Sequence, residues 1–211
     1  TFSNPVQATP LSKTLHPLLP QAKPKTCAKK ILFELLQGLR YLHERNIAHH
    51  DLKPENILFD DQLRVKIADF GSCIEKGRNP KSLCSTVGYA APEIYCFYDD
   101  YVMQFYSNND SKEQNVASPK AIQKSIFQSD IWSVGVIAYL VNLHYCPWDN
   151  YPGPDSFHQF YLDAKNCNLT YPEFLNSDLT KFINDCLNFD PYKRPTVDEL
   201  LNSPWLSSND Y

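Results

Sequence analysis

The chain has 211 residues, of which 43% are hydrophobic and 21% are charged, and a formal net charge of −4. This composition is typical of a folded globular protein that buries one sizeable core. The acidic balance argues against a general nucleic-acid binder, which needs a broad basic face to follow the phosphates. No apolar run approaches the roughly 18–20 residues that span a bilayer, so we expect no membrane contact.

The cysteines indicate a reducing environment. There are seven, an odd number, and no two of them form a C-x-x-C pair. Cysteines used in this way are typical of buried free thiols in reducing compartments. We therefore expect an intracellular protein of the cytoplasm or nucleus.

The first 45 residues divide into an irregular lead-in and a long helix. Residues 1–25 contain Pro5, Pro10, Pro17, Pro20 and Pro24, a density that excludes long helices. Residues 26–45 are predicted to be helical, with Thr26 as a candidate N-cap. Their apolar residues recur at helical spacing and form one stripe: Ile31, Leu32, Leu35, Leu36, Leu39 and Leu42.

Polar residues that suit phosphate chemistry follow this helix, between short strand candidates. Residues 47–48, 57–59 and 65–68 are apolar and of strand length, and a polar turn separates the last two. A hairpin formed by the last two of these segments would bring Asn56 and Asp69 to the same end of a small sheet. Together with Asp51 and Lys53, these side chains form a set suited to holding Mg²⁺ and a phosphate donor.

The middle of the chain is predicted to be mostly loop. Residues 72–90 are polar, and they end just before Ala91, Pro92 and Glu93. Residues 94–128 are low in apolar residues at their centre, which favours a surface insertion, with bounds of about 97–127.

Helices are expected again from Asp130 onward. Residues 130–143 are apolar on nearly every face, which predicts a helix buried all round. Residues 155–211 alternate helical patterns with proline breaks.

These motifs together resemble a known family. Three segments carry this resemblance: the run His49, His50, Asp51, Leu52, Lys53, Pro54, Glu55, Asn56, then Asp69-Phe70-Gly71, and then Ala91-Pro92-Glu93. In that order they resemble the catalytic loop, the DFG motif and the APE motif of eukaryotic Ser/Thr protein kinases. The resemblance covers nearly everything from about residue 26 to 206. It implies a mainly α fold, namely the C-terminal (large) lobe of a kinase, in which a helical bundle supports a small β-hairpin sheet carrying the catalytic and DFG loops. Residues 1–25 would be an irregular lead-in near the interlobe hinge, 26–206 the lobe, and 207–211 a tail.

The resemblance also implies three catalytic residues. Asp51 would orient the substrate hydroxyl and accept its proton as the catalytic base. Lys53 would reach the transferring phosphate as a point charge. Thr86 would bond to both of these residues, as a hydroxyl does at this place in Ser/Thr kinases. The plainer alternatives are that Asp51 caps a turn and that Thr86 is an ordinary loop residue.

By the same resemblance the cofactors would be ATP and Mg²⁺, and the partner a protein substrate with a Ser or Thr acceptor. Asn56 and Asp69 would ligate the metal through oxygen. Leu58 would form the apolar floor under the adenine, although it could equally be ordinary sheet core. The full set expected to bind the cofactor is Lys53, Glu55, Asn56, Leu58 and Asp69.

Structural roles are expected for other residues at family positions. Glu93 and Arg194 would form a buried ion pair, and Asp130 would accept backbone hydrogen bonds from the catalytic loop. Trp132 and Trp205 are expected in the core.

The sequence departs from the family pattern in two ways. His50 stands where most kinases have an arginine that pairs with an activation-segment phosphate, and a mostly neutral histidine makes control by loop phosphorylation unexpected. The first glycine is Gly38, and neither G-x-G-x-x-G nor a V-A-I-K strand precedes His49. The resemblance therefore covers the large lobe alone, and we expect these residues to be inactive by themselves.

Two further hypotheses remain open at this point. One is a non-catalytic, pseudokinase-like scaffold that binds a protein partner. The other is redox control through Cys73 and Cys84.

Overall fold

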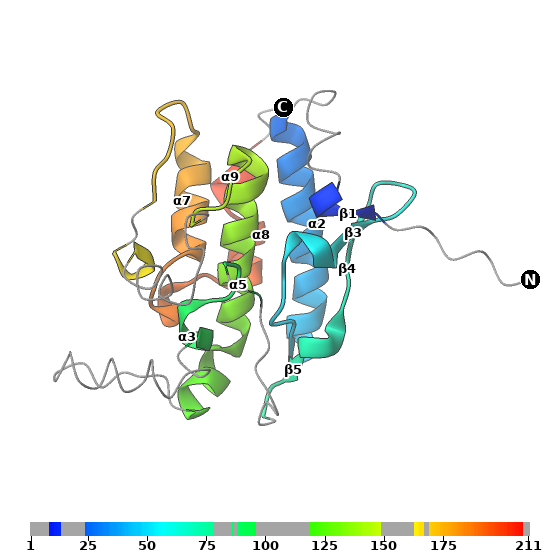
Figure 1. The fold of residues 1–211 in the computed structure, drawn as a ribbon, viewed down its shortest axis with the longest axis vertical. Coiled ribbons are helices and arrows are strands. Elements are labelled where there is room, and N and C mark those ends of the chain that lie inside the picture. Colours follow the sequence, from blue (N-terminus) through cyan, green and yellow to red (C-terminus); the bar gives the residue numbers. More distant parts are fainter. Residues whose placement is uncertain are drawn as a thin grey trace, which may run out of the picture.

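Two long helices side by side organise the fold. The computed structural model describes residues 9–13, 24–77, 86, 88–95, 119–148, 163–166 and 169–208. Helix α2 (Pro24–Glu44) contacts α5 (Pro119–Leu143), which also contacts α7 (Ser177–Cys186), so that α5 lies between the other two (Figure 1). The shorter helices are α3 (Pro92–Tyr95), α8 (Val197–Leu201) and α9 (Pro204–Ser207). The expected mainly α fold is confirmed.

Helix α2 buries the apolar stripe that the sequence predicts. All six of its predicted stripe residues are buried in the main core: Ile31, Leu32, Leu35, Leu36, Leu39 and Leu42. The helix begins at Pro24, so Thr26 lies within it and the predicted N-cap is wrong. Proline is well tolerated in a first turn, where its missing N–H would have no helical partner.

The strands form two small antiparallel sheets. Strand β3 (Ile57–Phe59) lies between β1 (Thr9–Pro10) and β4 (Val65–Ile67), and β2 (Ile47–Ala48) pairs with β5 (Ile74–Glu75). The predicted hairpin is therefore present. The described part of the lead-in is not irregular, because β1 pairs with Leu58 and Phe59, and Leu11 after it is buried. Pro10 is compatible with this because β1 is an edge strand.

Helix α5 starts earlier than predicted. It runs from Pro119 rather than Asp130, so residues 119–127 of the expected insertion are helical, while 96–118 lie outside the described residues. Its Ile126–Leu143 window is long and apolar enough to cross a membrane, contrary to our expectation, but 72% of that window is buried inside the protein. A core helix accounts for this hydropathy, since it must be apolar on every face.

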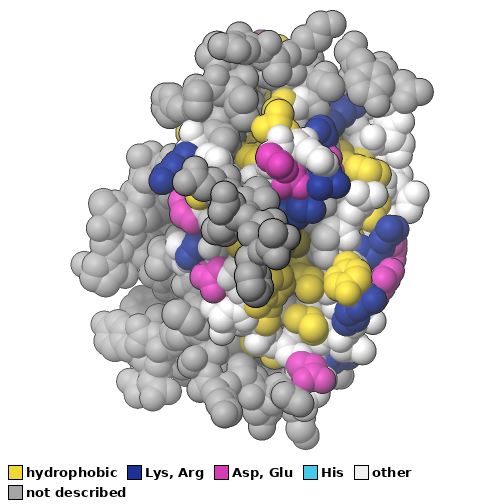
Figure 2. All heavy atoms as spheres, turned by 90° about the vertical axis from the view of Figure 1, so that its right-hand side faces the viewer, with side chains coloured by type: hydrophobic (Ala, Val, Ile, Leu, Met, Phe, Trp, Pro, Cys, Tyr) yellow, Lys and Arg dark blue, Asp and Glu magenta, His cyan; other side chains and the backbone are white. Residues whose placement is uncertain are grey.

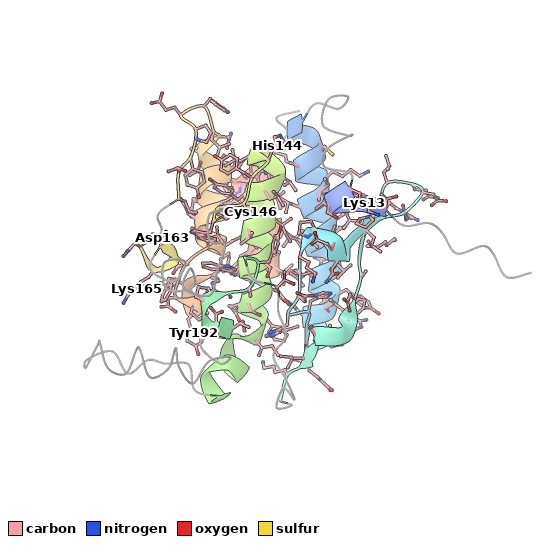
Figure 3. The ribbon with its side chains drawn as sticks, viewed as in Figure 1. Lys13, His144, Cys146, Asp163, Lys165 and Tyr192 are labelled. Atoms are coloured by element: carbon pink, nitrogen blue, oxygen red, sulfur yellow. The ribbon has the colours of Figure 1, made fainter. Side chains whose placement is uncertain are left out.

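The C-terminal helices close the core beside α5. Trp132 and Trp205 are buried as predicted; Trp132 stacks on Trp148 and Trp205 packs on Phe182, with ring centroids 5.2 and 4.9 Å apart. Side chains fill the space between α2, α5 and α7, whereas Asp163, Lys165 and Tyr192 lie towards the edge of the molecule (Figure 3). Helix α8 begins with a capping box in which Thr196 and Glu199 bond reciprocally.

The face beside the β3–β4 hairpin carries charges of both signs. Figure 2 shows Lys and Arg interspersed with Asp and Glu around hydrophobic side chains on this side. At the hairpin turn, Asp60 pairs with both Arg64 and Lys66. The described part of this face is thus not a single-sign field of the kind that tracks a phosphate backbone.

Candidate active site

The loop of residues 49–56, which the motif predicts to be catalytic, is anchored by one buried carboxylate on α5. Asp130 accepts the backbone N–H of His49 on Oδ2 and that of His50 on Oδ1, both at 2.8 Å, and its Oδ2 lies 2.9 Å from His43 Nε2. Burial alone would raise the pKa of Asp130, but the hydrogen bond from His43 and the nearby imidazoles outweigh it and lower the pKa. The predicted hydrogen bonds from the loop to Asp130 are present.

Asp51, Lys53 and Thr86 form a closed hydrogen-bonded triangle. Thr86 Oγ1 lies 2.7 Å from Asp51 Oδ1, Lys53 Nζ lies 2.7 Å from Thr86 Oγ1, and the same Nζ lies 2.9 Å from Asp51 Oδ2. The Thr86 N–H also donates to Asp51 Oδ1 at 3.2 Å. The structure thus joins residues separated by more than thirty positions in the sequence, and the contacts expected of Thr86 are present.

His49 links this triangle to the strand that leads to Asp69, a role that the sequence did not reveal. Its Nδ1 accepts the N–H of Asp51 at 3.3 Å, so the hydrogen of a neutral ring is on Nε2, which lies 3.0 Å from Ala68 O. His49 is fully buried, and its ring packs edge-on against Phe70. The only sequence signal was a histidine immediately before the His50–Asp51 pair.

The two residues expected to ligate a metal lie at one end of the β3–β4 hairpin. Asn56 donates its amide to Asp51 O at 2.8 Å and to Asp51 Oδ2 at 3.2 Å, which turns its carbonyl oxygen away from Asp51. The Ala68 N–H donates to the backbone O of Asn56 at 2.9 Å, so Asp69, the residue after Ala68, follows directly on a residue that contacts Asn56. Asp69 is exposed, has a left-handed φ of 60°, and accepts the Gly71 N–H on Oδ1 at 3.2 Å.

This donor set fits Mg²⁺ bound together with a nucleotide. An amide oxygen and a carboxylate are the hard ligands that Mg²⁺ prefers, and Mg²⁺ commonly completes its shell with substrate phosphates and water. Among the described residues there is no group of three or more His, Cys, Asp or Glu that could hold a metal ion by themselves. These residues would therefore hold Mg²⁺ only jointly with the phosphates it neutralises.

Two further residues of the expected nucleotide site lie next to Asn56. Glu55 is exposed in the 3₁₀ turn Pro54–Asn56. Leu58 is half-buried in β3, between buried Ile57 and Phe59, so one side of it remains accessible. The contribution of Glu55 and Leu58 to nucleotide binding stays a prediction.

A buried ion pair ties the segment after Thr86 to the C-terminal helices. Arg194 Nη1 and Nη2 donate to Glu93 Oε1 and Oε2 at 2.6 and 2.8 Å. Arg194 also donates to Gln128 O at 2.9 Å and to Asn188 O at 2.8 Å. The predicted pair is therefore present, and its arginine has partners on three segments.

The described cysteine of the redox hypothesis is unsuited to that role. Burial, followed by the charges of Asp130 and Asp69, raises the pKa of the Cys73 thiol to about 11. A redox-sensing cysteine needs a lowered pKa. Cys84 lies outside the described residues.

Comparison with known proteins places this geometry in context. The family model described as "Protein kinase domain" matches residues 7–206. Similar curated proteins include the probable serine/threonine-protein kinase fhkA of Dictyostelium discoideum, 32% identical over 85% of this chain and 32% of that protein. The DNA damage response protein kinase DUN1 of Saccharomyces cerevisiae is 31% identical over 87% of this chain and 36% of its own length. The SNF1-like protein kinase ssp2 of Schizosaccharomyces pombe is 29% identical over 86% and 27%. The chain thus spans about a third of the length of these relatives.

Proposed function

This chain belongs to the protein kinase family, and on that premise we propose that it performs the phosphoryl transfer of a Ser/Thr protein kinase. The γ-phosphate of ATP would pass to a Ser or Thr hydroxyl of a protein substrate. The observation that carries the proposal is the Asp51–Lys53–Thr86 triangle, with contacts of 2.7, 2.7 and 2.9 Å. The residues of this triangle match the pattern of Ser/Thr kinases, and the curated relatives named above include a probable serine/threonine-protein kinase.

Each member of the triangle has a chemical task in this proposal. Asp51 orients the substrate hydroxyl and accepts its proton, which is typically worth about 10²–10⁴-fold in rate. The Lys53 ammonium, already 2.9 Å from the Asp51 carboxylate, supplies positive charge where the phosphoryl group is transferred. Thr86 fixes both groups relative to each other, because its hydroxyl donates to Asp51 and accepts from Lys53.

ATP and Mg²⁺ would supply the phosphoryl group and neutralise its charge. Asn56 and Asp69 would hold the metal, and Lys53, Glu55 and Leu58 would line the nucleotide side of the site. The 211 residues contain no G-x-G-x-x-G segment, and in kinases such a loop covers the phosphates. We therefore propose that a phosphate-covering small lobe is required for activity and that the 211 residues form the large lobe. The odd number of cysteines and the lack of a C-x-x-C pair support a further proposal, that the protein acts inside the cell.

The test uses the full-length product of the gene, purified and assayed for transfer of labelled phosphate from ATP to casein in the presence of Mg²⁺. We expect incorporation into Ser and Thr, and a loss of about 10²–10⁴-fold in kcat for Asp51→Asn. Asp61→Asn is the matched control, because Asp61 is exposed in the turn of the β3–β4 hairpin. Its kcat should equal that of the parent.

The alternative hypothesis, a non-catalytic scaffold that binds a protein partner, predicts the opposite result. If the full-length product transfers no phosphate, or if Asp51→Asn leaves transfer intact, the kinase proposal is wrong. The 211-residue chain assayed alone addresses a separate point. Asp51-dependent transfer by this chain would overturn the requirement for a small lobe without touching the kinase assignment.

A further inference from the structure

His50, immediately before Asp51, has an unusual backbone conformation and a buried side chain. Its φ is 64°, in the left-handed region that non-glycine residues rarely adopt, and only 5% of its surface is exposed. Asp130, which lies on α5, accepts the backbone N–H of His50. The imidazole points to the same helix, with its Nε2 3.4 Å from Ser129 Oγ.

The direction of the His50–Ser129 contact follows from the single hydrogen of a hydroxyl. Ser129 Oγ lies 2.8 Å from Ile126 O, one turn earlier in α5, and this shorter contact takes the hydroxyl hydrogen. The lone pairs of Ser129 Oγ therefore face the imidazole, and His50 Nε2–H donates to them. A chain of hydrogen bonds then runs from the catalytic loop through Ser129 to the backbone of α5.

The surroundings of His50 favour a neutral ring. Burial lowers the pKa of His50. It outweighs the carboxylates of Asp130 on α5 and Glu93 on α3 and a hydrogen bond to the backbone of Ile126, all of which act to raise the pKa, whereas neighbouring His49 acts in the same direction as burial. Because the ring is neutral and turned towards α5, its hydrogen-bonding Nε2 is engaged within the fold.

We propose that His50 is a positioning residue, whose buried imidazole fastens the loop carrying Asp51 to α5 through Ser129. This rests on the proposed function, since what His50 positions is the proposed catalytic base. Loss of the bridge would let the loop shift relative to α5 and so misalign Asp51 with the bound substrate hydroxyl. Small misplacements of a catalytic group reduce turnover more than binding, so kcat should fall while KM changes little.

A double-mutant cycle in the full-length protein tests the bridge. We expect His50→Ala and Ser129→Ala each to lower kcat about 3- to 10-fold, the range for one neutral hydrogen bond, with KM for ATP and peptide within twofold. The double variant should be no slower than either single one. His50→Gln, which can keep a donor towards Ser129, should stay within twofold of the parent.

One control separates positioning from a general loss of packing. Ser133→Ala removes a buried hydroxyl one turn along α5 that lies 2.8 Å from Tyr89 O and 3.3 Å from the backbone O of Ser129. Because this change leaves the Ser129 hydroxyl in place, its effect should multiply with that of His50→Ala.

Independent, multiplicative effects of His50→Ala and Ser129→Ala would overturn the bridge, as would a His50→Gln variant no better than His50→Ala. If the parent protein transfers no phosphate, the proposed function fails. The His50→Ala and Ser129→Ala cycle is then repeated with the free energy of unfolding as the measured quantity. A coupling of zero between His50 and Ser129 in that measurement would overturn the bridge, and a clear coupling would support it.

Discussion

Arg194 and Glu93 meet in a two-pronged ion pair, at 2.6 and 2.8 Å, although they are 101 positions apart. Arg194 precedes α8 and Glu93 lies in α3, shortly after Thr86. Both are almost fully buried. The pair therefore holds the segment that follows Thr86 against the C-terminal helices, and it links the position of a proposed catalytic side chain to the stability of the core.

Arg194→Ala should destabilise the fold by about 3–5 kcal/mol, because it leaves the Glu93 carboxylate buried without its partner. The free energy of unfolding measured by denaturant titration checks this. Lys181→Ala is a suitable control, since Lys181 pairs with Asp185 in an exposed i,i+4 contact. That change should stay within about 0.5 kcal/mol of the parent, and a similar small effect for Arg194→Ala would show that the buried pair is dispensable.

Gly135→Ala should also destabilise the fold, because α5 and α7 approach closely there. A Cβ at Gly135 would lie 2.7 Å from Cys186 Cβ and 2.8 Å from Leu187 Cγ, which forces the helices apart. Overpacking of this kind typically costs about 1–3 kcal/mol. The midpoint of thermal unfolding checks the loss.

Gly38→Ala provides the contrast within another core helix. A Cβ at Gly38 would meet only the Ile67 side chain, with its terminal Cδ1 at 3.0 Å and its Cγ1 at 3.5 Å. The gain of about 1 kcal/mol in helix propensity over glycine offsets this contact. We expect Gly38→Ala to be neutral or stabilising, and an equal loss for both variants would contradict the close-approach explanation.

Thr86→Ala should lower kcat about 10- to 100-fold, because its hydroxyl bonds both Asp51 and Lys53 and hydrogen bonds to charged groups are worth about 1.5–3 kcal/mol. Thr86→Ser keeps the hydroxyl and should recover most of the rate. The measurement is kcat of the full-length protein on a peptide with one Ser acceptor. Equal losses for the Ala and Ser variants would assign the effect to packing of the threonine methyl group.

The sequence predicted the local elements well where hydrophobic periodicity was strong. The α2 stripe and the β3–β4 hairpin appear as expected, because helical and strand spacing determine which face is buried. It misplaced the ends of elements. Helix α2 starts at Pro24 rather than Thr26. Helix α5 starts at Pro119 rather than Asp130, because the few apolar residues of 119–128 directly follow a polar segment and form too short a stripe to mark a helix start.

The candidate site was predicted by motif, and its connections required the structure. The spacing of the two strand segments predicted that Asn56 and Asp69 lie at one end of a hairpin. No periodicity in the sequence relates Thr86 to Asp51, or Arg194 to Glu93. Motif resemblance proposed these pairs, and tertiary packing forms them. The ring contacts of His49 with Ala68 and of His50 with Ser129 had no sequence signal, because the ring orientation depends on backbone dihedrals and on neighbours far along the chain.

Phosphorylation at Ser82 or Ser85 should have little effect on activity, although both residues lie outside the described ones. The family resemblance implies that His50 stands where most kinases have the arginine that pairs with such a phosphate, and here His50 is buried and directed at Ser129. Ser82→Asp, Ser85→Asp and the matching Ala variants should keep kcat within twofold of the parent. A change of tenfold or more in either direction would show that a charged group there controls the enzyme.

Cys73 should react slowly with alkylating reagents in the folded protein. Burial raises its pKa from 9.0 to about 11, so at a pH below 9 its thiolate fraction is about 100-fold lower than that of an ordinary thiol. The thiolate is the reacting form, so iodoacetamide at pH 8 should label Cys73 about 100-fold more slowly in the folded state than in urea. Peptide mass spectrometry over a time course measures both rates. The Cys73→Ser variant, assayed after mild peroxide treatment, should lose as much activity as the parent loses. Rapid labelling of Cys73, or protection of activity by the serine, would revive redox control at this position.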